Sequence, residues 1–174
     1  MFSLSFDSSH RVLLAQFAGV LSSQDIEGLH NALVAFVAHH GFARGILDFS
    51  SVQANALPHS FLMRRARLPQ ILLRQERIIV APQQELHELA RAYVAQQRDF
   101  GNLEGQIVRT LDDAYLALDL KQPDFRPLLT ATDYLSQLSS PPCGGLTPDL
   151  LRRQLVRSRL SRLCLFGEGP PKAC

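Results

Sequence analysis

The feature that most constrains the fold of this chain is the alternation of strand and helix patterns across residues 1 to 120. Apolar and polar residues alternate over residues 2–7, which predicts a half-buried strand, and a polar turn leads into a second, more apolar strand over residues 12–20. Two strands joined by so short a turn predict an antiparallel hairpin. Because helices and strands alternate after this hairpin, we expect a mostly parallel sheet with right-handed crossovers.

Start and stop signals delimit the elements that follow the hairpin. Ser22 or Ser23 can cap a helix that ends at Gly41, and Thr110 with Asp113 resembles a capping box. Pro69 predicts a kink in the second helix, or two short helices in its place. The expected elements are a helix to residue 40, a short strand and loop at 44–52, a helix from 58–60 to about 72, a strand at 77–81, a helix at 84–97, a strand at 106–109 and a helix at 111–120. This order predicts an α/β fold with a mixed sheet of about five strands and helices mainly on one face.

Composition limits the class of protein. A chain of 174 residues with 46% apolar and 20% charged residues can bury one good core, and its longest apolar runs are far below the roughly 20 residues that span a bilayer. The first residues lack the pattern of a secretory signal, so we expect a cytoplasmic protein without an integral membrane segment. The three cysteines, Cys143, Cys164 and Cys174, have neither the number nor the spacing of a disulfide framework or a zinc site. We expect no metal and no cofactor.

The last third of the chain differs from the rest in charge. Residues 1–120 hold ten Lys/Arg and twelve Asp/Glu, whereas residues 121–174 hold eight and four. Five prolines within residues 121–148 predict a linker that can hold one short helix, and residues 149–174 read as a basic amphipathic helix with a disordered end. Three interpretations of this helix stay open: it packs on its own domain or on a second copy, it binds a membrane or a foreign protein, or it is disordered.

Three segments resemble a known family. The strand and loop at 45–52, the strand at 77–82 with the helix after it, and residues 108–114 are similar to elements of the SpoIIAA-like family of the STAS/SEC14-like fold. The resemblance covers residues 1 to about 120, and it implies a sheet backed by helices and a regulatory, non-enzymatic role through protein–protein contacts. Members that antagonise anti-sigma factors carry a phosphorylatable Asp-Ser-Ser-Gly turn. The stretch after Asp48 has no such turn, so this switch cannot be transferred.

Ser60 is the nearest candidate for a phosphorylated serine, and a group of arginines follows it in the sequence. A phosphate on Ser60 would gain from exposed helix amides and from Arg64, one turn on; the other interpretation is that Ser60 only begins the helix. Arg64, Arg65 and Arg67 form either a solvated helix face or a docking surface for an acidic partner or an anionic lipid head group. Residues 1–120 lack the broad basic footprint that nucleic-acid binding requires.

Asp48, His59 and His87 are the residues to search for chemistry. Asp48 is expected at the carboxyl end of a parallel strand, where open α/β sheets place ligands, and each histidine follows a strand in the same way. A carboxylate and an imidazole in hydrogen-bond reach can perform acid–base catalysis. The other interpretation is that Asp48 fixes its own loop through backbone hydrogen bonds. The sequence has neither a nucleophile elbow nor a glycine-rich phosphate loop.

We therefore expect a non-enzymatic regulatory or protein-interaction module that contacts a protein partner or a second copy of itself. Its first alternative is a SEC14-like carrier or sensor of a small apolar or lipid ligand, which requires a cavity of a few hundred Å³ beneath the 58–73 helix. A partner-binding module requires a packed core and an exposed apolar patch instead. The second alternative, a hydrolase-like enzyme, requires Asp48 to meet His59 or His87 in a cleft.

Overall fold

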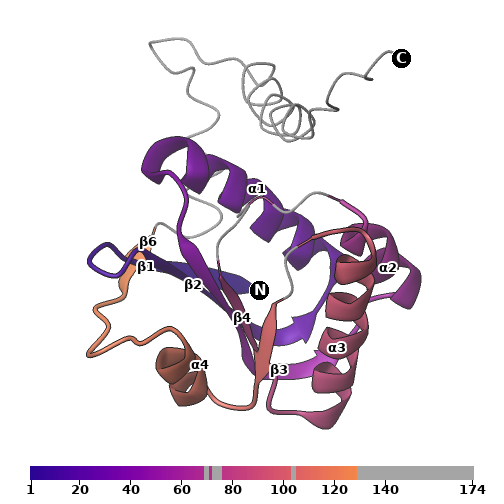
Figure 1. Ribbon diagram of the computed structural model, residues 1–174. Coiled ribbons are helices and arrows are strands. Elements are labelled where there is room, and N and C mark those ends of the chain that lie inside the picture. Colours follow the sequence, from indigo (N-terminus) through magenta and orange to yellow (C-terminus); the bar gives the residue numbers. More distant parts are fainter. Residues whose placement is uncertain (69–70, 72–75, 103–104, 129–174) are drawn as a thin grey trace, which may run out of the picture. The chain divides into compact units, whose positions relative to one another are not determined.

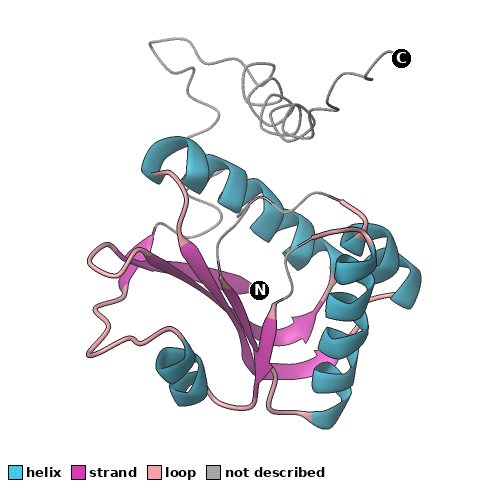
Figure 2. Cartoon of the chain, viewed as in Figure 1, coloured by secondary structure: helices cyan, strands magenta, loops and turns pink. Residues whose placement is uncertain are grey.

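The computed structural model describes residues 1–68, 71, 76–102 and 105–128. The chain divides into two units, residues 1–139 and 140–174, and the second lies outside the described residues, as do both helices expected beyond residue 129. The elements, seen in Figures 1 and 2, are β1 (Phe2–Asp7), β2 (Val12–Leu21), α1 (Ser23–His40), β3 (Arg44–Asn55), α2 (His59–Ala66), β4 (Arg77–Val80), α3 (Gln84–Asp99), β5 (Gln106–Val108), α4 (Leu111–Ala117) and β6 (Arg126–Leu128). No helix in the described part of the chain is long and apolar enough to cross a membrane.

The strands form one mixed sheet in the order β5-β4-β3-β2-β1-β6. β2, β3, β4 and β5 run parallel to one another, while β1 is antiparallel to β2 and to β6. The predicted α/β class, the mostly parallel sheet and the opening hairpin are confirmed. The sheet has six strands among the described residues rather than about five, and the additional strand, β6, falls within the residues expected to be a linker.

Helices α1, α2 and α3 cover one face of the sheet, and α4 covers the other (Figure 1). The larger core lies under the three helices and includes Phe17 and Phe36, which are almost fully buried. The smaller core joins Val12, Ile46 and Val80 to α4. Because side chains alternate along a strand, neighbouring residues of β3 enter different cores, and this alternation decides which of them reach the site described below.

Two of the predicted helix caps are present. The Ser22 side chain accepts a hydrogen bond from the backbone amide of Asp25, whose carboxylate accepts one from the Ser22 amide. Thr110 and Asp113 make the same reciprocal pair at the start of α4. Gly41 ends α1 with a φ of 75°, a backbone conformation that favours glycine.

Two elements differ from the sequence prediction. β3 is a long strand rather than a short strand and loop, because it continues to pair with β2 as far as Asn55, through two register shifts, after its pairing with β4 ends at Asp48. α2 is shorter than expected and ends at Ala66, with Arg67 as its C-cap. Pro69, on which the predicted kink depends, lies outside the described residues.

Asp7 joins the opening hairpin to the chain that leads into β6. Its carboxylate is buried and accepts hydrogen bonds from the backbone amides of Ser9, His10 and Asp124, and it contacts His10 Nδ1 at 2.8 Å. Burial alone would raise the pKa of Asp7, but the hydrogen bonds from His10 and Asp124 together lower it. Asp7, the last residue of β1, therefore links two segments more than a hundred residues apart in sequence.

Candidate functional site

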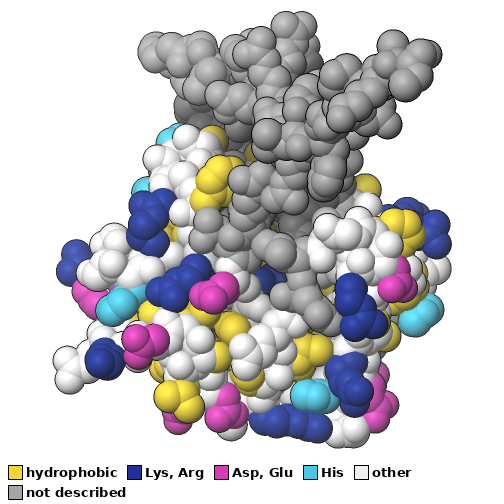
Figure 3. All heavy atoms as spheres, viewed as in Figure 1, with side chains coloured by type: hydrophobic (Ala, Val, Ile, Leu, Met, Phe, Trp, Pro, Cys, Tyr) yellow, Lys and Arg dark blue, Asp and Glu magenta, His cyan; other side chains and the backbone are white. Residues whose placement is uncertain are grey.

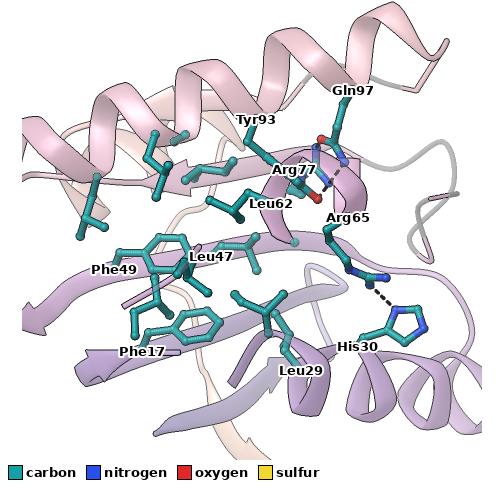
Figure 4. Close-up of a pocket in the computed structure, with 18 of the residues that line it drawn as sticks. Phe17, Leu29, His30, Leu47, Phe49, Leu62, Arg65, Arg77, Tyr93 and Gln97 are labelled. Atoms are coloured by element: carbon teal, nitrogen blue, oxygen red, sulfur yellow. Dashed lines mark hydrogen bonds between the residues drawn. The ribbon is translucent and has the colours of Figure 1, made fainter. Parts of the chain in front are cut away.

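A cavity of about 140 Å³ lies between the sheet and the helices α1, α2 and α3. Figure 4 shows side chains from both layers pointing into it. Phe17, Leu47 and Phe49 line it from the strands, and Leu29 and Leu62 line it from the helices. Phe17 and Phe49 stack with ring centroids 4.7 Å apart, so one end of the cavity has an aromatic wall.

The opposite end of the cavity is polar. In Figure 4, Arg77, Gln97 and Tyr93 gather at the end away from the two phenylalanines. The Nη2 of Arg77 donates a hydrogen bond to Oε1 of Gln97, whose Nε2 donates to the Tyr93 hydroxyl at 3.0 Å. The Nε of Arg77 is buried and has no hydrogen-bond partner within the described part of the chain. Three polar side chains thus form a chain that leaves a donor of the guanidinium unsatisfied.

A second arginine lines the same cavity. Arg65, at the end of α2, donates from Nη2 to Nδ1 of His30 on α1 (Figure 4). Burial lowers the pKa of His30, and the positive charge of Arg65 lowers it further. Both effects favour the neutral ring, whose unprotonated Nδ1 can accept the hydrogen bond from Arg65.

The charge in the cavity is not balanced by the described residues that line it. Two arginines line the cavity, and no described lining residue is aspartate or glutamate. Burial lowers the pKa of Arg77, and Tyr93 acts on this pKa in the opposite direction. A guanidinium does not give up its proton in a protein, so the charge itself persists.

Local sequence explains why Arg77 occupies this place. It is the first residue of β4, paired with Gly45 of β3, and the next three residues of the strand are buried. A Cβ atom at Gly105 would lie 3.1 Å from Nε of Arg77, so glycine at this position leaves room for the guanidinium. A larger residue at position 105 would therefore push the Arg77 side chain aside.

The sheet separates the three residues expected to share an active site. Asp48 is buried on the face of the sheet that α4 covers, and its carboxylate accepts hydrogen bonds from Gln16 Nε2 and the Ser50 amide. Burial raises the pKa of Tyr115, and the charge of Asp48 raises it further. His59 and His87 are carried by α2 and α3 on the opposite face. Asp48 also does not end its strand, because β3 runs on to Asn55. The pairing that the hydrolase hypothesis requires is not formed.

The other predicted binding residues lie on or beside α2. His59 and Ser60 are exposed in the first turn of the helix, whose N-cap, Pro58, makes no side-chain cap. Arg64 and Arg67 are exposed, and their guanidinium groups lie over the rings of Phe61 and Phe100. Among the predicted candidates, only Arg65 lines the cavity. Phosphorylation of Ser60 stays a prediction.

His87 is the one predicted candidate with a polar atom left unsatisfied among the described residues: its Nδ1 is buried and has no partner. On the face shown in Figure 3, basic and acidic side chains of the described residues are interspersed. No group of three potential metal ligands occurs in the described part of the chain.

Sequence reasoning missed Arg77, Gln97, Tyr93 and His30. One signal was present: Gln97 continues the helical spacing of Leu86, Ala90 and Tyr93, so it occupies an apolar position of α3 and is almost fully buried. A polar residue in such a position predicts an internal hydrogen-bond partner. The identity of that partner, Arg77, depends on tertiary packing and has no local signature.

No protein-family model matches the chain, and no curated protein sequence matches it. Among solved structures, the chain is similar to the anti-sigma factor antagonist SpoIIAA in its unphosphorylated form. The two chains are 12% identical with a TM-score of 0.45, and the similarity covers 67% of this chain and 96% of SpoIIAA.

Proposed function

We propose that the domain is a non-enzymatic binding module that holds a small, largely apolar molecule in the cavity between its sheet and helices α1, α2 and α3. The observation that carries this proposal is the cavity itself, about 140 Å³ of space within a core that is otherwise packed by residues such as Phe36 and Ile79. Protein cores normally contain few voids larger than a water molecule, so a space of this size calls for an occupant.

The size of the cavity limits the ligand. It is smaller than the few hundred Å³ expected for a lipid carrier, and it is close to the roughly 150 Å³ of an engineered cavity that binds benzene. Six buried carbons at ~0.8 kcal/mol each contribute about 5 kcal/mol, which corresponds to a Kd on the order of 0.1–1 mM. The ligand that fits is therefore a molecule with a ring or a short branched chain.

A regulatory role is supported by the elements that meet at the cavity. α2 contributes Leu62 and Arg65, while α1 contributes Leu29 and His30. A molecule between them would add contacts to α2, a helix of only eight residues. Binding can therefore change how firmly α2 is held, and with it the exposed surface of α2 that a partner would contact.

The test is a methyl-resolved NMR titration of the full chain with toluene. We expect saturable shifts of the methyl groups of Leu29, Leu62 and Leu86, which line the cavity, and no shift at Leu118 in the other core or at the exposed Leu116. Leu118 and Leu116 serve as internal controls for non-specific partitioning. Equal shifts in both cores, or none up to the solubility of toluene, refute the proposal.

A second candidate is a protein-interaction module, and a specific surface favours it. Leu68 and Phe100 are 46% and 48% exposed, and the Asn102 side chain bonds to the carbonyls of Ala66 and Leu68, which brings the two segments together. Large exposed apolar side chains grouped in this way are typical of contact surfaces.

Native mass spectrometry of the full chain, purified from its own host, tests this second candidate. A dimer or a complex that is lost in Phe100→Ser and retained in Val20→Ser supports contact through this surface, since Val20 is also exposed but lies at the end of β2. A monomer, or a complex that is insensitive to Phe100→Ser, contradicts it.

A further inference from the structure

Arg77 presents a cation for which the described residues provide no counter-charge. It lines the cavity, and its Nε is buried and has no hydrogen-bond partner among the described residues. The hydrogen bond that its side chain donates to a described residue goes to the neutral amide of Gln97. The four salt bridges found among the described residues involve neither Arg77 nor Arg65. A buried charge without a partner is expensive, so the site gains from any anion that reaches it.

We propose that the ligand of the cavity is a small organic monocarboxylate, with its carboxylate on Arg77 and its apolar body toward Phe17 and Phe49. This inference rests on the function proposed above and adds the chemical class of the ligand. A guanidinium offers up to five N–H donors in a planar fork that matches a carboxylate, and the described residues engage one of them, through Gln97.

The shape of the cavity favours this class over other anions. Its two ends differ, with arginine and glutamine at one end and stacked phenylalanine rings at the other (Figure 4). An inorganic phosphate would leave the aromatic end empty, and a dicarboxylate would bring a second charge to the apolar wall. A single carboxylate on a six- to eight-carbon body satisfies both ends.

Three nearly isosteric compounds test the charge of the ligand on the wild-type chain: benzoate, neutral benzamide and cationic benzamidine. Hydrogen bonds to charged groups are stronger than neutral ones, so we expect benzoate to bind about tenfold or more tightly than benzamide. Benzamidine should give no detectable binding, because it would place a second cation beside Arg77. The measurement is the NMR titration of the Leu29 and Leu62 methyl groups.

The outcomes separate the two proposals. If benzamide and toluene bind as tightly as benzoate does, the carboxylate inference is overturned and the proposed function stands. If toluene shifts the cavity methyl groups and benzoate does not, only the carboxylate inference fails. If neither toluene nor any of the three compounds shifts them, both fail. Binding of benzoate in preference to benzamide, with shifts at the cavity methyl groups alone, supports both.

Arg77→Met provides the matched variant, because it removes the charge and keeps an unbranched apolar stem. We expect it to weaken benzoate about tenfold, to the level of benzamide, and to leave benzamide within twofold of wild type. Arg64→Met is the control, since Arg64 is exposed on α2 and does not line the cavity. An unchanged benzoate affinity in Arg77→Met overturns the assignment to Arg77. The comparison of compounds on the wild-type chain remains decisive if that variant does not fold.

Discussion

Filling the cavity should stabilise the protein and abolish ligand binding, and Ala90→Leu is the substitution that tests this. Ala90 lies on α3 and lines the cavity, and its side chain is half-buried. Leucine at this position would extend three further carbon atoms into a space that the protein leaves unfilled. In a packed core the same substitution would force neighbours apart and cost about 1–3 kcal/mol.

The size of the effect follows from the cavity. A volume of about 140 Å³ at ~24 cal/mol per Å³ sets an upper limit of about 3 kcal/mol for filling it completely. Three carbon atoms at ~0.8 kcal/mol each supply about 2.4 kcal/mol, from which the lost rotamer freedom of leucine removes ~0.5–1 kcal/mol. We therefore expect Ala90→Leu to raise the free energy of unfolding by about 1.5 kcal/mol, or the Tm by about 5 °C.

The assay is urea unfolding followed by circular dichroism, paired with the toluene titration. Ala92→Leu is the matched control, because Ala92 lies on the same helix and is exposed; its stability should change by no more than about 0.5 kcal/mol. Loss of toluene binding with a gain in stability in Ala90→Leu alone is the expected result. A loss of 1 kcal/mol or more in that variant would show that the space does not exist, and the proposed function would fall with it.

Further predictions concern the elements around the site. Asp7→Ala should lower the free energy of unfolding in urea by about 3 kcal/mol, because three backbone amides lose a buried acceptor. Asp124→Ala is the control and should lower it by about 0.5 kcal/mol or less, because the Asp124 carboxylate is exposed and pairs with Arg126. The fold holds the pKa of His30 below that of the unfolded chain, so protons bind the unfolded chain preferentially and stability falls as the pH drops below about 6.5. His30→Gln should flatten this part of the pH–stability curve, and an unchanged slope contradicts the shifted pKa. Ser22→Ala should cost about 1 kcal/mol by removing the cap of α1, whereas an equal loss in Ser23→Ala would show that the cap is not specific.

The parts of the fold that could be predicted are those that depend on neighbours in sequence. The alternation over residues 2–7 and the caps at Ser22 and Thr110 are local patterns, and the structure contains all three. β6 could not be predicted in this way, because three residues that include Pro127 carry no strand pattern of their own. Their pairing with β1, over a hundred residues earlier, defines the strand. Proline is tolerated there because β6 is an edge strand.

The candidate site was harder to predict because it depends on faces of the sheet as well as on its edges. The expected meeting of Asp48 with the histidines used the rule that strand ends converge at one edge of a parallel sheet. That rule ignores the alternation within β3, which sends Ile46 and Asp48 toward α4 and Leu47 and Phe49 toward the cavity. Alternation was readable from the sequence, but the positions of the helices relative to the two faces were not.

The energetics of the cavity are the reason to regard it as a binding site rather than as a packing defect. An empty space of this size lowers stability by about 3 kcal/mol at most, and a single leucine at position 90 would recover part of it. The same core also holds the cation of Arg77, for which no described residue lining the cavity supplies a counter-charge, where an apolar residue would be more stable. Two independent departures from good packing therefore meet in one place, and a carboxylate with a small apolar body would correct both. Departures of this kind are expected at functional sites, where stability is given up for binding.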